Sequence, residues 1–152
     1  MKWKTIFVPF ARKIQQATYV KIAKKAKKIS QKHFEVHQKD DKGDLVTNLD
    51  VEIEKYLISE MQNNYPDYTI VSEEFNSQNH TTDNCYIIDP IDGTINFANG
   101  LPLWGVQIAC RKNGKTIASV INLPKLDEFY YADETGAYLN AQKISVAEVP
   151  IK

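Results

Sequence analysis

The sequence feature that most constrains the fold is an alternating apolar stretch that leads into a tight turn. From Trp104 to Cys110, large apolar residues alternate with small or polar ones, which is the period of a strand with one buried face. Asn113-Gly114 follows between charged residues, and this dipeptide is typical of a two-residue hairpin. We therefore expect a return strand over 116–122. Because a hairpin joins antiparallel neighbours, the sheet cannot be purely parallel.

The remaining elements follow from apolar spacing and turn residues. Spacings of three and four predict a helix over about 7–32 and a second over about 48–63, which Tyr65-Pro66-Asp67 ends. The expected buried face of the second helix comprises Val51, Ile53, Leu57, Ile58 and Met61. Short strands are predicted at 35–38, 69–72, 85–89, 128–132 and 137–139. This order of elements predicts the α+β class, and the length of 152 residues fits about one domain.

Segment 86–97, Tyr-Ile-Ile-Asp-Pro-Ile-Asp-Gly-Thr-Ile-Asn-Phe, carries the strongest chemical signal. Asp89 and Asp92 follow a short apolar run, and carboxylates so close repel each other unless a cation lies between them. Such hard oxygen ligands favour Mg²⁺. At Gly93 and Thr94 the chain should enter a short helix, whose free N–H groups suit an anion. An acidic surface turn is the simpler explanation of a bare Asp-x-x-Asp-Gly, since Asp, Pro and Gly are common turn residues.

Two further acidic segments precede this one. Glu73 and Glu74 end the predicted strand at 69–72, where paired acids are usually solvated. In the string Asp-Leu-Val-Thr-Asn-Leu-Asp at 44–50, Thr47 or Asn48 is the expected N-cap, and Asp50 falls in the first helical turn. A capping acid near the positive end of a helix explains Asp50 without any catalytic role.

Taken together, Asp-Pro-Ile-Asp-Gly-Thr-Ile-Asn-Phe at 89–97, Glu73-Glu74 and the string at 44–50 resemble the signature of the inositol monophosphatase family. The resemblance covers about 39–146, and Ser72 stands where the family has a glycine. It implies a Mg²⁺-dependent, lithium-sensitive phosphomonoesterase with two or three ions in a complete site. The implied architecture is the first domain of the sugar-phosphatase (αβαβα) fold, an antiparallel-rich sheet covered by paired helices.

The resemblance also implies a role for each matching residue. The implied metal ligands are Glu73, Asp89, Asp92 and the carbonyl of Ile91. The implied catalytic residues are Glu73, Thr94 and Asp50, with Asp50 bonded to Thr94. The implied substrate-binding residues are Glu73, Ile91, Asp92, Gly93 and Thr94. Glu74 and Lys39 are expected to support the site. The implied reaction is hydrolysis of inositol monophosphate or a related sugar phosphate by metal-activated water.

Family members carry a second α/β domain, whose Trp-Asp motif supplies another metal ligand. Neither Trp3 nor Trp104 is followed by Asp. Residues 1–152 are therefore expected to form a single N-terminal metal- and phosphate-binding domain without that C-terminal domain. Such a chain is expected to be a homo-oligomer or to need the C-terminal half. The alternative is a truncated, catalytically inactive remnant that binds cation and phosphate only.

The charge distribution bears on which partners the chain could bind, and the two cysteines bear on its redox compartment. Formal net charge is zero, yet no acid precedes Glu35, while ten lysines and arginines do. A basic helix could serve as an interaction module for a membrane or nucleic acid, but a solvated lysine face is simpler, so we expect neither partner. We expect Cys85 and Cys110 to be buried free thiols, as in the reducing cytoplasm.

Overall fold

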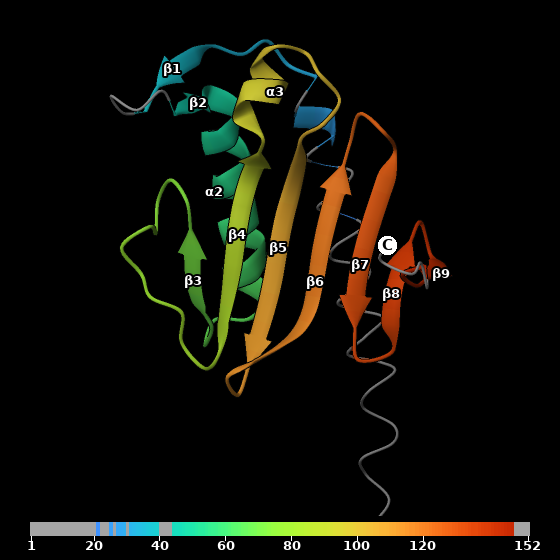
Figure 1. The fold of residues 1–152 in the computed structure, drawn as a ribbon. Coiled ribbons are helices and arrows are strands. Elements are labelled where there is room, and N and C mark those ends of the chain that lie inside the picture. Colours follow the sequence, from blue (N-terminus) through green and yellow to red (C-terminus); the bar gives the residue numbers. More distant parts are fainter. Residues whose placement is uncertain (1–20, 22–24, 26, 30, 40–43, 148–152) are drawn as a thin grey trace, which may run out of the picture.

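The predicted hairpin lies at the centre of a seven-stranded sheet in the computed structural model, which describes residues 21, 25, 27–29, 31–39 and 44–147 (Figure 1). Strands β5 (Gly105–Lys112) and β6 (Lys115–Leu123) are antiparallel. Between them, Asn113 and Gly114 have φ of 50° and 74°, the left-handed conformations that a two-residue hairpin turn requires. The hairpin prediction is confirmed.

The strand order is β3-β4-β5-β6-β7-β8-β9. The other strands are β3 (Thr69–Ser72), β4 (Cys85–Asp92), β7 (Glu128–Asp133), β8 (Gly136–Leu139) and β9 (Gln142–Ile144). Only β3 and β4 are parallel; every other pair in this sheet is antiparallel. The predicted strands are confirmed, but β4 runs beyond 89, because its pairing with β5 resumes between Asp92 and Gly105 after an irregularity. Strand β9 was not predicted.

A small antiparallel pair lies beside the main sheet. It consists of β1 (Val36–Gln38), which confirms the strand predicted at 35–38, and β2 (Leu45–Thr47), which was not predicted. Strand β2 leads directly into α2 (Asn48–Asn64). Of the helix predicted over 7–32, Lys21, Lys25 and residues 27–29 are described and are helical. Gln31 and Lys32 are also described and form a turn and a bend, so the helix ends before the predicted residue 32. The other residues of that prediction lie outside the described part of the chain.

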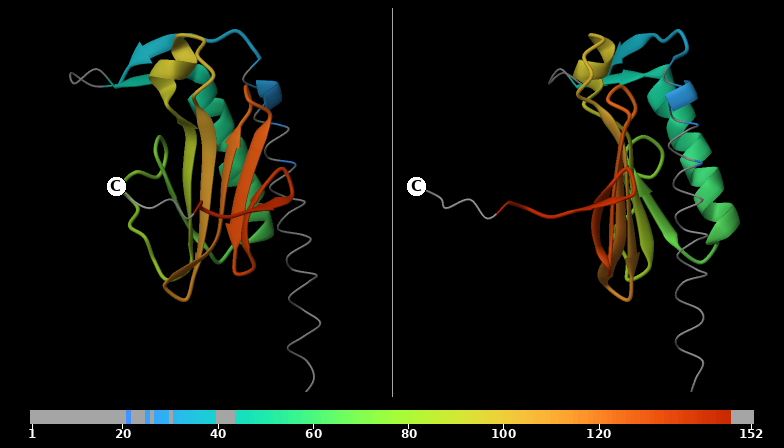
Figure 2. Two further views of the ribbon diagram at one scale, coloured as in Figure 1. Left: turned by 45° about the vertical axis from the view of Figure 1, so that its right-hand side comes forward. Right: turned by 90° about the vertical axis from the view of Figure 1, so that its right-hand side faces the viewer.

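A capping box starts α2. The Thr47 side chain accepts hydrogen bonds from the Leu49 and Asp50 amides, and the Asp50 carboxylate accepts one from the Thr47 amide at 2.7 Å. Of the two predicted N-caps, Thr47 is the correct one. The helix packs mainly on β4 and covers one face of the sheet (Figure 2). The second described helix of more than one turn, α3 (Thr94–Ala98), follows β4 directly.

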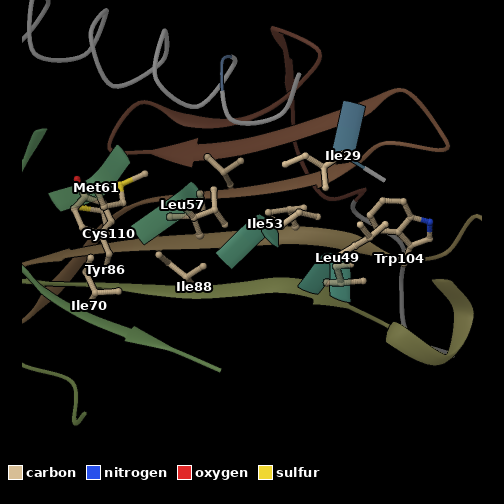
Figure 3. Packing of buried hydrophobic residues seen from close by; sticks show 14 of the residues in the cluster. Ile29, Leu49, Ile53, Leu57, Met61, Ile70, Tyr86, Ile88, Trp104 and Cys110 are labelled. Atoms are coloured by element: carbon tan, nitrogen blue, oxygen red, sulfur yellow. The ribbon is translucent and has the colours of Figure 1, made fainter. Parts of the chain in front are cut away.

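The core lies between α2 and the sheet (Figure 3). Leu49, Ile53, Leu57 and Met61 recur at intervals of four along α2 and are fully buried. The same cluster includes Trp104, just before β5, and six residues of the sheet: Ile70, Tyr86, Ile88, Val106, Ile108 and Cys110. The predicted helix face was partly wrong, because Val51 and Ile58 are only half-buried while Leu49 and Glu54 lie inside. The centre of the observed buried face is rotated about the helix axis toward Asp50 and Glu54.

The opposite face of the sheet has no described helix over it, as the right-hand view of Figure 2 shows. Ile87, Ile117 and Ile121 are each 37–40% exposed. Cys85 and Cys110 are buried free thiols, as predicted. Among the described residues, no helix is both long and apolar enough to cross a membrane.

Candidate metal and phosphate site

Strands β3 and β4 deliver the acidic residues to one end of the sheet. The two strands are parallel, and Ser72 is the partner of Ile88. Glu73 and Asp89 are the next residues along, so they leave the pair at the same end. The start of α2, with Asp50, lies at this end as well, since Thr94 contacts Asp50. The structure therefore brings together the three segments that the sequence singled out.

Asp89 combines an unpartnered carboxylate oxygen with a raised pKa. Its Oδ1 atom is buried and has no hydrogen-bond partner within the described part of the chain. Burial raises the pKa of Asp89 to about 7, and the negative charges of Glu73, Asp92 and Asp50 contribute to this rise. A buried carboxylate oxygen without a donor is costly, and a cation would remove that cost.

Glu73 and Glu74 share the ammonium group of Lys39. Lys39 Nζ lies 2.8 Å from Glu73 Oε1 and 2.7 Å from Glu74 Oε1. Partial burial lowers the pKa of Lys39, but hydrogen bonds and charge attraction from the two glutamates outweigh it, so the pKa is raised. The lysine lies at the end of β1, and the sequence alone did not predict this pairing.

Asp92 and Ile91 occupy the irregular end of β4. Asp92 is exposed, and its Oδ2 atom accepts a hydrogen bond from Gln107 of β5. The Ile91 side chain is buried, and its carbonyl accepts a hydrogen bond from Thr94 Oγ1 at 2.9 Å. Gly93 follows with φ of 84°, and a Cβ there would lie 3.0 Å from the Leu103 carbonyl oxygen. A larger residue would therefore be strained at Gly93.

Asp50 joins the helix cap to the acidic turn. One carboxylate oxygen belongs to the capping box, and the other lies 3.4 Å from Thr94 Oγ1, a long hydrogen bond. Burial raises the pKa of Asp50, while its bonds from Thr47 oppose that rise. The two interpretations of Asp50 from sequence, capping acid and partner of Thr94, are therefore both observed contacts.

Sequence reasoning missed Glu54. This residue is fully buried, and its carboxylate accepts hydrogen bonds from Ser72 Oγ at 2.6 Å, the Glu74 amide at 2.8 Å and the Phe75 amide at 2.7 Å. A usable signal was present, because Glu54 follows Asp50 by one helical turn and adjoins Ile53 on the buried face. The hydroxyl of Ser72, at the position where the family has glycine, thus has a specific acceptor.

The donor set suits a hard cation. Carboxylates together with a backbone carbonyl are ligands that Mg²⁺ prefers. The described residues nevertheless contain no group of three His, Cys, Asp or Glu side chains close enough to hold one ion. In the described structure, Glu73 is paired with Lys39, and Asp92 accepts a hydrogen bond from Gln107. The residue types and the orphaned Asp89 oxygen fit a cation, provided that these two side chains turn toward it.

Comparison with known proteins agrees with this architecture. The sequence pattern described as "Inositol monophosphatase family" matches residues 4–152. A fructose-1,6-bisphosphatase/inositol-1-monophosphatase of Thermotoga maritima is 39% identical over 114 residues, which are 74% of this chain and 44% of the relative. The Nus factor SuhB of Escherichia coli is 35% identical over 132 residues, 82% of this chain and 49% of the relative. An IMPase/NADP phosphatase solved with Mg²⁺ and phosphate superposes with a TM-score of 0.78 at 23% identity, covering 90% of this chain and 53% of that one.

Fold and relatives define the class as an α+β protein of the inositol-phosphatase type. The chain belongs to the inositol monophosphatase family. It spans about half the length of the curated relatives that it matches.

Proposed function

We propose that this chain forms the cation- and phosphate-binding part of a Mg²⁺-dependent phosphomonoesterase that hydrolyses inositol monophosphate or a related sugar phosphate. The observation that carries the proposal is the buried, unpartnered Oδ1 atom of Asp89, with Glu73, Asp92 and Asp50 near enough to shift its pKa. So much negative charge at one end of a sheet is stable only with a bound cation or an extra proton.

In this proposal, Glu73, Asp89, Asp92 and the Ile91 carbonyl hold the ions. When bound, Mg²⁺ would lower the pKa of a water molecule and offset charge on the phosphate and on the leaving oxygen. Two or three ions are expected in a complete site. Lys39, which forms ion pairs with Glu73 and Glu74, would support the site through Glu74 when Glu73 turns toward an ion.

Thr94 is the proposed water-positioning residue. Its one hydroxyl hydrogen has the Ile91 carbonyl and Asp50 as acceptors, so its lone pairs are available to accept a hydrogen bond from water. Glu73 would share that water with Thr94. The backbone N–H groups of Gly93 and Thr94 are proposed to bind phosphate oxygens, in keeping with the resemblance of segment 89–97 to the family signature.

A second candidate function is binding of cation and phosphate without hydrolysis. It is favoured because the chain spans only about half the length of the curated relatives that it matches. A further polypeptide could complete the site. We propose that a second copy, or the remaining length found in the relatives, would pack on the sheet face with Ile87, Ile117 and Ile121.

We also propose a cytoplasmic location, which the free thiols of Cys85 and Cys110 suit.

Thermal unfolding measured against Mg²⁺ and Mn²⁺ concentration tests the proposed site. We expect stabilisation that saturates, and no stabilisation in Asp89→Asn. An equal response in that variant would exclude the assignment. Release of phosphate from inositol 1-phosphate then separates the two candidates, because the binding-only protein shows the cation response without turnover.

Self-association is a separate question. Size-exclusion chromatography with light scattering should show dimers or larger species if the exposed sheet face is covered by a second copy. A clean monomer at high concentration that binds no hydrophobic dye would argue against that part of the proposal.

A further inference from the structure

Glu54 is the buried charged residue that the proposed reaction leaves without a role. It lies in the interior of α2, and its side chain is completely inaccessible to solvent. Placing a carboxylate there is costly unless its oxygens are fully hydrogen-bonded. Here the three donors all come from one short segment, residues 72–75. The helix is therefore bonded to the segment that carries Glu73.

Glu73 itself has few contacts that could fix its position. Its side chain is 47% exposed, and within the described part of the chain Lys39 is its hydrogen-bond and ion-pair partner. The backbone on either side is held more firmly. Before it, Ser72 is paired with Ile88 and donates its hydroxyl to Glu54; after it, the Glu74 and Phe75 amides donate to the same carboxylate. Asn76 Nδ2 also donates to Ser72 Oγ at 3.1 Å.

The same helix holds the other side of the site. Asp50, one turn before Glu54, contacts Thr94 at the start of α3. Two buried carboxylates on one rigid helix therefore contact both segments that must face each other across the carboxylate cluster. A movement of either segment relative to α2 would break hydrogen bonds to a buried charge.

We propose that Glu54 is a positioning residue, whose carboxylate fixes the turn at residues 72–75 and thereby holds Glu73 beside Asp89 for cation binding. The inference rests on the proposed function, since it assumes that Glu73 and Asp89 share a cation. It assigns Glu54 no contact with the ion or the substrate. Removing such a supporting partner typically weakens metal binding by about 10–100-fold.

The experiment compares cation affinity with stability in matched variants. Mn²⁺ binding is measured by isothermal titration calorimetry on the wild-type chain, Glu54→Gln, Ser72→Ala and Leu57→Ala, all below their unfolding temperatures. Leu57 lies one turn after Glu54 and is equally buried, so Leu57→Ala reports what lost stability alone does to binding. Glu52→Gln changes an exposed carboxylate of the same helix, paired with Lys32.

We expect Glu54→Gln to weaken Mn²⁺ binding roughly tenfold or more. Ser72→Ala, which removes one bond and leaves the carboxylate, should weaken it less. Leu57→Ala and Glu52→Gln should bind as the wild type does. Hydrogen exchange should speed up at the Glu74 and Phe75 amides in the Glu54 variant, beyond the change that Leu57→Ala causes.

The outcomes distinguish the positioning role of Glu54 from the proposed cation site itself. If the wild type binds Mn²⁺ and Glu54→Gln binds it equally well, the positioning role is wrong while the proposed site stands. If the wild type binds no Mn²⁺, the proposed site fails, and the inference fails with it. Should Glu54→Gln not fold, Ser72→Ala decides: wild-type affinity together with unchanged exchange at Glu74 and Phe75 overturns the inference.

Discussion

The two halves of the buried face of α2 are equally buried but differ in chemistry, because only the N-terminal half carries carboxylates, Asp50 and Glu54, beside its apolar residues. Glu54 and Leu57 are successive members of this face, and neither is accessible to solvent. Toward the N-terminus, Asp50 and Glu54 accept hydrogen bonds from the site segments. Toward the C-terminus, Leu57 and Met61 pack on apolar side chains of the sheet (Figure 3). Burial alone therefore does not distinguish core from functional site on this helix.

The difference has a direct physical consequence. Apolar packing is not directional, so the Leu57 half stabilises the fold without specifying where any polar group must lie. A buried carboxylate requires donors at defined positions, so the Asp50 and Glu54 half specifies where the site segments lie. Substitutions in the two halves should therefore separate stability from cation binding.

The largest effect on stability is expected from Leu57→Ala. Removing a fully buried leucine side chain should lower the free energy of unfolding by about 2–5 kcal/mol, because a cavity remains. Urea unfolding measures this loss, and Ile58→Ala, at a half-buried position, should cost less. Cation affinity should not change. A weakened affinity in Leu57→Ala would show that the two halves of the helix are not separable.

The next effect is loss of the cation response in Asp89→Asn. At a hundredfold excess of Mg²⁺ over its Kd, ligand linkage should stabilise the wild type by about 2.7 kcal/mol, and the variant should gain nothing. Asp67→Asn serves as control, since Asp67 is exposed and lies in the turn after α2. Thermal unfolding with and without Mg²⁺ checks both. Loss of the response in the control would point to a non-specific effect of charge.

A smaller effect is expected from Thr94→Val, which removes the hydroxyl and keeps the shape. The Ile91 carbonyl and Asp50 each lose a donor, so unfolding should become easier by about 1 kcal/mol. Thr94→Ser keeps the hydroxyl and should retain most of the stability. Equal losses in the two variants would mean that the methyl group contributes as much as the hydroxyl. No loss in Thr94→Val would mean that the contacts of the hydroxyl with Ile91 and Asp50 contribute little.

The smallest effect is the loss of stability at alkaline pH, which involves Tyr65 at the C-terminal end of α2. Burial raises the pKa of Tyr65 above its usual value near 10, although a hydrogen bond with Tyr86 opposes the rise. In the unfolded chain Tyr65 loses its proton first, so the free energy of unfolding should fall as pH rises above 10. Tyr65→Phe should reduce that slope in urea unfolding between pH 9 and 11. An unchanged slope would assign the alkaline loss to other groups, such as Tyr68, whose pKa burial also raises.

Local signals in the sequence determined much of this protein. The Asn113-Gly114 hairpin and the alternation from Trp104 to Cys110 are confirmed, and the N-cap is Thr47, one of the two residues predicted for it. Each depends on neighbours a few residues apart, where backbone preference and apolar spacing act directly. The acidic strings were found in the same way, and the resemblance that they carry led to the family.

Tertiary structure alone decided which polar groups meet. The sequence could not show that Lys39 pairs with Glu73 and Glu74, because β1 and the end of β3 come together only when both are packed at one end of the sheet. It also placed the buried face of α2 slightly wrong, since apolar spacing defines a stripe, while the capping box and the contacts of Asp50 set the rotation of the helix. In the sequence, Glu54 resembles an ordinary surface glutamate; it is buried because residues 72–75 pack against it in the folded protein. Donors separated from it by about twenty residues of chain are what make its burial stable.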